Sequence, residues 1–572
     1  MKRFSPGFLT ALVLGVSVLF QAMGLPASDQ SAVLKLDRLT TREAKGLRVK
    51  NVVMMIPDGM GVGASTLGRW YKFAKTGVNS LVFDDLVCGL VRTYWATGLI
   101  TDSAPSAAAM ATGFKTSYGS VSLRPAKVTM PDVPALLEGQ ALTPVATVLE
   151  AARSLGLATG LVVTCEFPHA TPAGFSSHYT QRSAMDLLAE QQVYQGMDVV
   201  LGGGRKYLNP QSRKDKENLV KVLEERGYLY VTDTEAMRAA RPGKLWGSFA
   251  EAGMERDIDR DPLKEPSLVE MTQKALTVLS RNPKGFFLMV EGSQIDWGAH
   301  ANDPIGTATE VLGFDRAVAA VLEFAEKDGQ TAVIIAADHS TGGFSIGNPE
   351  VGDLPWEKFL PITKAKMTAT KAAALLAAGE PKNLAESGSL ISDALGVDDL
   401  RPAEVTELDT LLKERNAKRL ELFLGRVVSR RVGAGWAFTG HGGEDVALYI
   451  RHPRGLRLGG VIQNTDIAAY ISKCLGFDLR LLTDRLFVPA AAAFSAVGAK
   501  TRVDITDPEN PVFVAVRDGQ TLRLPVNKSY AEWNGKAVEL GGVIVTTGAI
   551  GAKVTDDPSV WFVPKRAVDL FK

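Results

Sequence analysis

Histidine and carboxylate side chains gather where apolar runs of this 572-residue sequence end. Four of its six histidines lie just past such runs or in a glycine-rich turn: His169, His300, His339 and His441. The same places carry four acids: Asp58, Glu291, Asp296 and Asp338. Imidazole and carboxylate donors without cysteine suit zinc and harder divalent cations. Each histidine alone is more typical of a hydrogen-bonded structural residue, but as a set these side chains predict a metal site.

The stretch from Ile100 to Gly113, ITDSAPSAAAMATG, is a second place where chemistry could occur. Serine and aspartate ahead of an alanine-rich run are typical of a helix N-cap, which is one interpretation. The other is that Ser103 is a nucleophile, because the amides and dipole of a helix N-terminus favour a phosphate or sulfate. Both interpretations stand on this stretch alone.

Four segments that carry these residues share one design, an apolar run rich in β-branched residues that ends abruptly in polar residues. They span residues 49–61, 158–172, 285–300 and 331–343. Continuous apolar character is typical of parallel strands covered on both faces, and helical patterns lie between them. We therefore predict an α/β fold with a doubly wound, mostly parallel sheet flanked by helices. Ligands of such sheets bind beyond the carboxyl ends of the strands, where all four polar tails lie.

The rest of the chain predicts further units. Residues 350–430 have a helical pattern, and we expect a helical insertion there. The sheet pattern returns at 440–453, so the catalytic domain spans about residues 45–480. Residues 485–572 are rich in valine, glycine and turn signals, which predicts a small β-rich module. Because every candidate catalytic residue precedes this module, we expect it to be an accessory for attachment or partner binding.

Composition and the N-terminus restrict the class of protein. The net charge of +1 comes from 64 basic and 63 acidic residues without a long like-charged block, so we expect no nucleic-acid-binding surface. Residues 1–24 combine a basic start, an apolar run and small residues, which is typical of a secretory signal peptide rather than a retained anchor. We expect a periplasmic or secreted protein whose mature chain has no membrane span. Three scattered cysteines exclude a disulfide framework, although one disulfide stays open: Cys88, Cys165 and Cys474.

Six motifs occur in the order and spacing of one known family. They are IPDGMG (56–61), TDSAPSAAAMATG (101–113), HATP (169–172) followed by Arg182, VEGSQIDWGAH (290–300), AADHSTGG (336–343) and GHGGEDV (440–446). Together they resemble the alkaline phosphatases over about residues 48–478, apart from the helical insertion. The resemblance implies hydrolysis of small phosphate monoesters, two zinc ions and a third metal, usually magnesium. It also implies a homodimer, the common state of that family.

The resemblance assigns a role to each residue. The implied ligands are Asp296, His300 and His441 for the first zinc, Asp58, Asp338 and His339 for the second, and Asp58, Thr171 and Glu291 for the third metal. Ser103 would be the nucleophile, Arg182 would hold the phosphate and Asp102 would orient Arg182. A serine hydroxyl is a poor nucleophile at neutral pH, so activation by a metal makes chemical sense. These roles favour Ser103 as the nucleophile and leave Ser106 as a residue of the helix start.

Two positions at which alkaline phosphatases differ among themselves hold His169 and Trp297 here. Well-known bacterial members carry aspartate and lysine at these positions, and animal members carry histidine at both. Imidazole suits zinc or cobalt better than magnesium. We therefore expect His169 to bind the third metal, and this site to prefer Co²⁺ or Zn²⁺ to Mg²⁺. The alternative is that His169 hydrogen-bonds a water on that metal.

Other functions compete with this interpretation. A sulfatase or phosphodiesterase of the same superfamily is the nearest, because SAPSA superficially resembles the sulfatase nucleophile segment. That pattern ends in arginine, whereas Ala107 stands here, and two metal sites with Arg182 favour phosphate monoesters. A catalytically silent surface protein stabilised by metals is a second alternative. The presence of every predicted catalytic residue argues against it.

Overall fold

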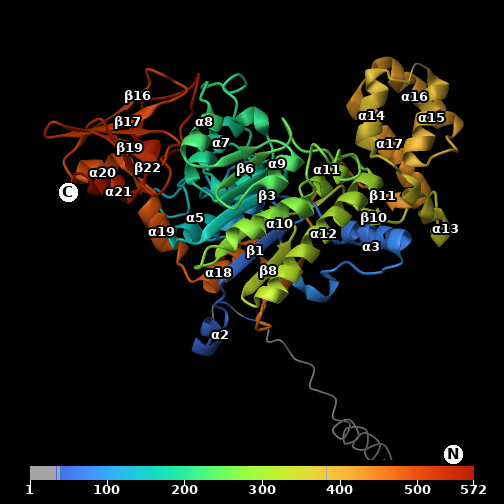
Figure 1. Cartoon of the computed structure of the whole chain (residues 1–572), viewed down its shortest axis with the longest axis horizontal. Coiled ribbons are helices and arrows are strands. Elements are labelled where there is room, and N and C mark those ends of the chain that lie inside the picture. Colours follow the sequence, from blue (N-terminus) through green and yellow to red (C-terminus); the bar gives the residue numbers. More distant parts are fainter. Residues whose placement is uncertain (1–33, 35, 37–38, 382) are drawn as a thin grey trace, which may run out of the picture.

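A ten-stranded sheet forms the centre of the protein (Figure 1). The structure is a computed structural model, and it describes Leu34, Leu36, residues 39–381 and residues 383–572. The predicted signal peptide lies outside the described residues. In order across the sheet the strands are β14 (Gly460–Gln463), β2 (Val87–Arg92), β13 (Val446–Arg451), β8 (Thr331–Ala336), β1 (Asn51–Ile56), β7 (Phe286–Glu291), β3 (Ala158–Glu166), β4 (Val199–Gly203), β6 (Leu245–Ser248) and β5 (Leu229–Val231).

The central strands end together at one edge of the sheet. Strand β1 pairs in parallel with β7 on one side and β8 on the other, and β3 continues the parallel order beyond β7. Ile56 lies opposite Glu291, and Met55 lies opposite Ile335, so these strands finish at the same level. Strand β13 runs antiparallel to both of its neighbours, β8 and β2. The polar residues that follow the four predicted strands therefore lie side by side.

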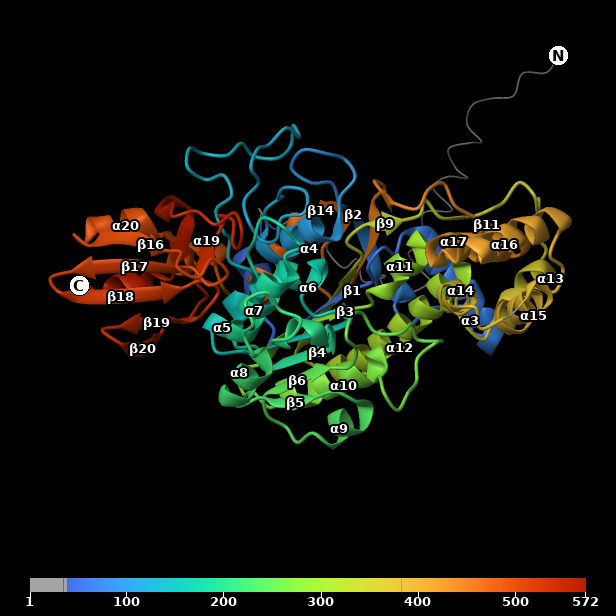
Figure 2. The same ribbon diagram turned by 90° about the horizontal axis from the view of Figure 1, so that it is seen from above.

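Helices cover both faces of the sheet (Figure 2). One group consists of α3 (Val62–Thr76), α10 (Leu268–Leu279) and α12 (Pro304–Asp328). These helices pack together, and the group contacts the sheet through α10 against β3 and α12 against β8. The second group is α4 (Ser103–Thr112), α5 (Val148–Ser154), α6 (Ala170–Ser176) and α18 (Asn464–Leu475). The alanine run of α4 permits close packing, because a Cβ placed on Gly174 of α6 would lie only 2.9 Å from the Cβ of Ala107. Small residues thus fix α4 closely against α6.

Shorter elements connect these layers. They are α2 (Thr41–Gly46), η2 (Asp84–Leu86), α7 (Met185–Gln195), η3 (Arg205–Tyr207), α8 (Leu219–Glu225), α9 (Thr234–Ala239), α11 (Gln294–His300), β9 (Ser340–Thr341) and β12 (His441–Gly442). None of the helices in the described ranges is long and apolar enough to cross a membrane. All three cysteines lie in described segments, and all three are free thiols.

A helical unit is inserted between the short strands β10 (Ser345–Ile346) and β11 (Ala434–Gly435), which pair with each other. Its elements are α13 (Trp356–Phe359), η4 (Leu360–Lys364), α14 (Ala369–Ala378), α15 (Leu384–Leu395), α16 (Pro402–Glu414) and α17 (Ala417–Val432). Buried leucines such as Leu408 and Leu420 form a hydrophobic cluster that extends to Leu67 of α3. The amphipathic helices of the insertion thus bury their apolar faces against each other and against the core.

The C-terminal region follows α19 (Leu479–Leu486) and is rich in β structure. Its elements are β15 (Val488–Pro489), α20 (Ala490–Ala496), β16 (Lys500–Asp504), β17 (Val512–Arg517), β18 (Gln520–Pro525), β19 (Tyr530–Trp533), β20 (Lys536–Glu539), β21 (Val545–Thr546), η5 (Pro558–Val560), β22 (Trp561–Val563) and α21 (Lys565–Asp569). Strands β16 to β20 form an antiparallel sheet with its own hydrophobic cluster around Phe513 and Trp561. This module and the helical insertion lie at opposite ends of the molecule (Figures 1 and 2). The predicted fold class is confirmed.

Candidate metal centre

Asp58, Asp338 and His339 form one cluster at the carboxyl ends of β1 and β8. Their ligand atoms lie within 4.8 Å of one another, and all three residues are buried. The Nε2 atom of His339 lies 3.3 Å from Asp338 Oδ2 and 3.7 Å from Asp58 Oδ1. Among the described residues, neither Asp58 Oδ1 nor Asp338 Oδ2 has a hydrogen-bond partner. Buried carboxylate oxygens without donors are costly, so this cluster fits a bound cation.

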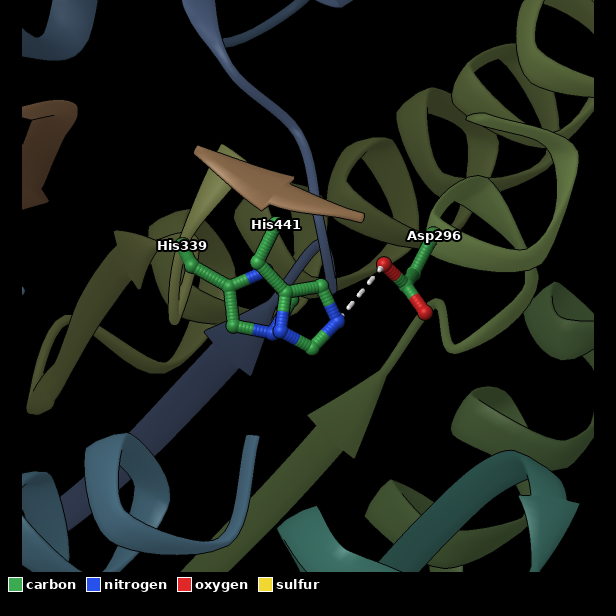
Figure 3. Close-up of side chains that lie close together, drawn as sticks. All are labelled: Asp296, His339 and His441. Atoms are coloured by element: carbon green, nitrogen blue, oxygen red, sulfur yellow. Dashed lines mark ion pairs between the residues drawn. The ribbon is translucent and has the colours of Figure 1, made fainter. Parts of the chain in front are cut away.

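Asp296, His300 and His441 converge beside that cluster. Helix α11 places Asp296 and His300 one turn apart on the same face, and His300 Nε2 lies 3.2 Å from Asp296 Oδ2. His441 comes from β12, which pairs with β9 directly after His339. Its Nε2 atom lies 3.1 Å from His300 Nε2 and 3.8 Å from Asp296 Oδ1 (Figure 3). The His441 ring also stacks on His339, with ring centroids 3.8 Å apart, so the two clusters adjoin.

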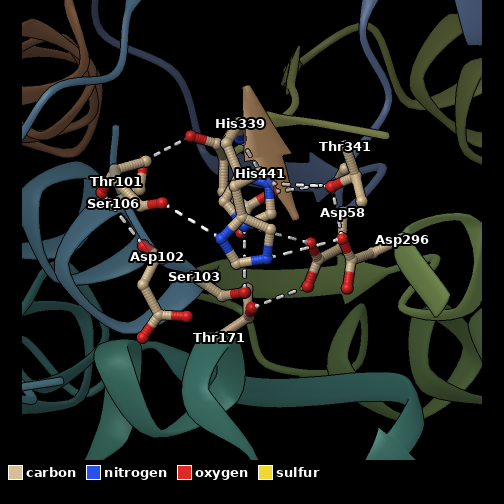
Figure 4. Close-up of polar contacts among 12 residues, drawn as sticks. Asp58, Thr101, Asp102, Ser103, Ser106, Thr171, Asp296, His339, Thr341 and His441 are labelled. Atoms are coloured by element: carbon tan, nitrogen blue, oxygen red, sulfur yellow. Dashed lines mark hydrogen bonds and ion pairs between the residues drawn. The ribbon is translucent and has the colours of Figure 1, made fainter. Parts of the chain in front are cut away.

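Each of these three imidazoles is oriented through its Nδ1 atom, and Figure 4 labels two of them, His339 and His441. The contacting oxygens are the carbonyl of Thr439 for His300, the carbonyl of Thr101 for His441 and the hydroxyl of Thr341 for His339. A carbonyl can only accept, so Nδ1 of His300 and of His441 carries a proton, and in the neutral ring Nε2 is left with a lone pair. Two Nε2 lone pairs 3.1 Å apart repel each other unless a cation or a proton lies between them. This arrangement is the usual preparation of histidine for metal binding.

Glu291 and Thr171 complete an oxygen-rich corner next to Asp58. The hydroxyl of Thr171 donates to Asp58 Oδ2 at 3.3 Å. Glu291 is fully buried, and its Oε2 accepts a weak contact of 3.5 Å from the thiol of Cys165. Its Oε1 has no hydrogen-bond partner among the described residues. Oxygen donors in this arrangement suit a hard cation such as Mg²⁺.

Ser103 begins α4 and points its hydroxyl toward the metal ligands. Its Oγ lies 3.2 Å from Nε2 of His339. Asp102 occupies the N-cap position, but its side chain makes no capping bond and pairs with Arg182 instead. The hydroxyl of Ser106 donates to the carbonyl of Asp338 at 2.7 Å and accepts from Asn464. Ser103 is therefore the serine whose hydroxyl faces the site. The hydroxyl of Ser106 instead connects α4 to the residues beside it.

Arg182 and His169 contact each other next to Asp102. The guanidinium of Arg182 contacts Asp102 through Nη1 and His169 Nε2 through Nη2, the second at 3.1 Å. His169 Nε2 must accept this bond, because a guanidinium can only donate. Its Nδ1 is buried without a hydrogen-bond partner in the described structure, and the ring meets Trp297 edge-on at 5.9 Å. With Nε2 accepting, Nδ1 of the neutral ring carries the proton, so the only lone pair that the ring could offer a metal is the one on Nε2, where Arg182 donates.

The protein groups alone leave the site with an excess of negative charge. Burial raises the pKa of Glu291 to about 7, and burial together with Asp338 and Asp296 raises that of Asp58 well above its usual value. Burial lowers the pKa of His441 to about 4. In contrast, the Arg182 guanidinium keeps the pKa of Asp102 below its ordinary value in spite of burial. Asp102 and Arg182 therefore form a stable ion pair, whereas Asp58 and Glu291 need a cation to favour their ionised forms.

The structure brings every residue of the predicted site to one edge of the sheet. Sequence reasoning missed the oxygens that orient the histidines, and it took Ser106 only as a residue of the helix start. Thr341 is the clearest omission, because its hydroxyl donates to Asp296 and contacts His339. Its place in the segment AADHSTGG, two residues after His339, was the available signal. The carbonyl groups of Thr101 and Thr439 carry no side-chain signal at all.

Fold and site together define a metal-dependent hydrolase of the α/β class that acts on an anionic ester. Comparison with known proteins narrows this class. The family described as alkaline phosphatase matches residues 49–477. Alkaline phosphatase 3 of Bacillus subtilis is 34% identical over 491 residues, which cover 84% of this chain and 99% of that protein. This chain belongs to the alkaline phosphatase family, and it is a phosphoric monoester hydrolase.

Solved structures agree with this membership. The cold-active alkaline phosphatase of the psychrophile Shewanella sp. is 31% identical, with a TM-score of 0.63 that covers 74% of this chain and 98% of that chain. The alkaline phosphatase of Thermus thermophilus is 26% identical, with a TM-score of 0.67 over 75% and 92% of the two chains. The resemblance seen in the six motifs is confirmed.

Proposed function

We propose that this enzyme hydrolyses phosphate monoesters through a phosphoserine on Ser103, in a site that holds two zinc ions and a third metal. The observation that carries the proposal is the 3.2 Å contact between Ser103 Oγ and His339 Nε2 at the start of α4. It supports Ser103 as the nucleophile because the hydroxyl lies directly beside a cluster of metal-binding side chains. The N-terminal amides of α4 add a favourable environment for a phosphate anion.

The proposed zinc ligands are the two adjoining clusters. They are Asp296, His300 and His441 for one ion and Asp58, Asp338 and His339 for the other. The unpartnered carboxylate oxygens and the facing imidazole nitrogens support this assignment. Zinc in these positions would supply Lewis-acid activation of the serine hydroxyl and of the leaving oxygen. The third metal is assigned to Asp58, Thr171 and Glu291, with His169 as an additional ligand.

The proposed reaction consists of two successive displacements at phosphorus. Ser103 Oγ attacks phosphorus, the bond from phosphorus to the alcohol oxygen breaks, and the alcohol leaves with a proton. Water attacks the resulting phosphoserine, which restores the serine hydroxyl and releases inorganic phosphate. The planar guanidinium of Arg182 can bind two phosphate oxygens, and its pairing with Asp102 fixes its direction.

Export, breadth of substrate and assembly belong to the same proposal. The basic, apolar and small-residue pattern of residues 1–24 supports a periplasmic or secreted enzyme. The proposed ligands contact only phosphate and metal, which supports a broad range of small monoesters. The homodimer is proposed from family membership.

The test is Ser103→Ala beside Ser106→Ala, a serine in the same helix that does not face the ligands. We expect Ser103→Ala to abolish phosphoenzyme formation and to lower turnover of p-nitrophenyl phosphate by about 10³-fold or more. Its zinc content should stay near that of the parent, because all six proposed zinc ligands remain. Ser106→Ala should still form the phosphoenzyme. Loss of zinc from a folded Ser103→Ala protein would show that the ligand assignment is wrong.

A further inference from the structure

A buried polar joint connects the C-terminal module to the core. The joint consists of side chains from three segments of the chain. They are Glu190 and Gln191 of α7, Arg213, Asp215 and Glu217 of the loop between η3 and α8, and Asn527 and Lys528 between β18 and β19. Gln191 and Arg213 are 0% exposed, and Asn527 is 1% exposed. Polar side chains buried this deeply are stable only when they are hydrogen-bonded, so the joint specifies one position of the module on the core.

Gln191 lies at the centre of this joint. Its Oε1 accepts from the backbone N–H of His178 at 2.8 Å, and its Nε2 donates to the carbonyl of the same residue at 3.0 Å. The second hydrogen of Nε2 goes to Oδ1 of Asn527, also at 3.0 Å. Asn527 in turn donates to Glu190 at 2.9 Å. Gln191 of the core is thus hydrogen-bonded to the backbone of His178, and Asn527 of the module fixes the position of the Gln191 side chain.

The charged side chains of the joint pair with one another. Lys528 pairs with Glu190 and Glu217, and Arg213 pairs with Asp215. Burial alone would lower the pKa of Lys528, but the two facing glutamates raise it above its ordinary value. Two cations face these three acids, and burial raises the pKa of Glu190, which favours a proton on the third acid. The cluster is therefore described as an ion network rather than as a further metal site.

The joint holds the loop that carries Arg182. This loop, residues 177–184, runs from α6 to α7, and Gln191 fixes its start at His178. The ring of Tyr179 points to the module, where its hydroxyl donates to the carbonyl of Gly548 at 3.3 Å. The N–H of Arg182 donates to the carbonyl of Gly119 at 2.8 Å, and α7 begins three residues later. Both ends of a short loop are therefore tied to elements that the module contacts.

We propose that Asn527 is a positioning residue of the reaction, through which the C-terminal module holds the Arg182 loop and so aims the guanidinium at the phosphate. This inference rests on the proposed role of Arg182. A displacement of about 1 Å in a group that orients the substrate can cost up to about 10²-fold in rate. The module would then be part of the phosphate site rather than a detachable accessory.

The experiment compares Asn527→Gly with Asn534→Gly in the full-length, metal-loaded enzyme. Both asparagines have a left-handed backbone, with φ of 63° and 49°, so glycine removes each side chain without straining the turn. Asn534 lies in the exposed hairpin between β19 and β20, away from the joint. We expect Asn527→Gly to raise the inhibition constant of inorganic phosphate by about five- to tenfold, and Asn534→Gly to leave it within about twofold.

The same change is then made in an Arg182→Ala background. If Asn527 acts through Arg182, Asn527→Gly should have less than about a twofold further effect on phosphate inhibition there. An equal effect in both backgrounds, or no effect in either, would overturn the inference while leaving the role of Arg182 intact. Unchanged phosphate inhibition in Arg182→Ala alone would overturn that role and the inference with it.

Tyr179→Phe provides a second, milder variant that keeps the ring and removes only the bond to Gly548. We expect it to raise the phosphate inhibition constant by about twofold, and again only when Arg182 is present. If Asn527→Gly does not fold, the inference is tested with Tyr179→Phe alone. An equal change of the phosphate inhibition constant with and without Arg182 would then overturn it.

Discussion

At the scale of single residues, two serines of helix α4 differ in the hydrogen bonds that their hydroxyl groups make. The Ser106 hydroxyl both donates, to the Asp338 carbonyl, and accepts, from Asn464. Ser103 has a contact of 3.2 Å with His339 and faces the ligand cluster. A nucleophile must have its hydroxyl available to a base or a metal, and Ser103 alone meets that condition.

The identity of the third metal is a prediction at this scale. His169 Nε2 accepts from Arg182 in this structure and Nδ1 carries the proton, so Nε2 can bind a metal only where the guanidinium turns toward the phosphate. After removal of metals and restoration of zinc, we expect cobalt or excess zinc to activate the parent more than magnesium does. His169→Asp should reverse this preference and gain activation by magnesium, because a carboxylate offers a hard oxygen ligand. The measurement is activity and bound metal during titration of each ion.

Full activation of the parent by magnesium, with no response to cobalt, would exclude direct ligation by His169. In that case the imidazole would act on a water of the third metal, which is the alternative open from the sequence. Metal content separates the two cases, since ligation by nitrogen predicts that cobalt stays bound when magnesium is in excess.

The donor residues of the site could be predicted from the sequence, but their orientation could not. Asp296 and His300 are recognisable at a spacing of four in a helical segment, and Asp338 and His339 follow an apolar run. His300 and His441 are each oriented by a backbone carbonyl from a distant segment, such as the Thr101 carbonyl 340 positions before His441. A backbone carbonyl is the same in every residue type, so no sequence pattern can mark it.

At the scale of elements, sequence reasoning identified the strands that carry ligands and missed those that only extend the sheet. The runs predicted at 49–61 and 285–300 contain β1 and β7, and both are buried throughout. Strand β5 has only three residues and an exposed start, and β14 is a partly exposed edge strand. Short edge strands lack the long apolar run on which recognition of a buried parallel strand depends.

The turn after β1 makes a prediction at this scale. Gly59 has φ of 71°, and a Cβ added there would lie 2.7 Å from Asp296 Cα and 2.8 Å from Asp296 Oδ1. Gly77 has φ of 75° but no atom within 4 Å of such a Cβ, so Gly77→Ala is a matched control. Both variants should lose about 1–2 kcal/mol of stability from the left-handed backbone. Gly59→Ala alone should also displace Asp296, lower the zinc content and reduce kcat/KM by about 10²-fold.

Zinc content, kcat/KM and melting temperature of the two variants provide the measurement. Equal zinc content and equal activity in Gly59→Ala and Gly77→Ala would contradict the role of Asp296 as a ligand. A larger loss of stability in Gly59→Ala that zinc reverses would support it.

At the scale of the whole molecule, two added units support opposite sides of one site. Helix α17 of the insertion packs so closely that a Cβ on Gly425 would lie 2.7 Å from the carbonyl oxygens of Ala301 and Asn302. Those residues directly follow His300. The C-terminal module contacts the loop of Arg182 from the other end of the molecule (Figure 2). The proposed metal ligand His300 and the proposed phosphate-binding residue Arg182 are thus each supported by a unit outside the central sheet.

The dependence of stability on pH should reveal how far the fold relies on its metals. Burial raises the pKa of Glu291 to about 7, above its unfolded value of about 4.5, and raises that of Asp58 in the same direction. Between these values the folded metal-free protein binds more protons than the unfolded chain, so its free energy of unfolding falls as pH rises. For Glu291 the loss is of the order of 3 kcal/mol from pH 4.5 to 7. A bound cation removes this penalty because it stabilises the carboxylate.

We therefore expect the melting temperatures of metal-stripped enzyme and of enzyme with all three proposed metal sites filled to differ little near pH 5 and to separate progressively up to about pH 8. The difference between the two forms is the quantity to measure, because buried acids outside the site cancel in it. Glu310 is such an acid, since burial also raises its pKa to about 7, but it accepts from the N–H of Asp257 in both forms. Glu291→Gln, which cannot ionise, should reduce the separation. A gap that stays constant from pH 5 to 8 would mean that metals stabilise the protein without relieving the buried carboxylates.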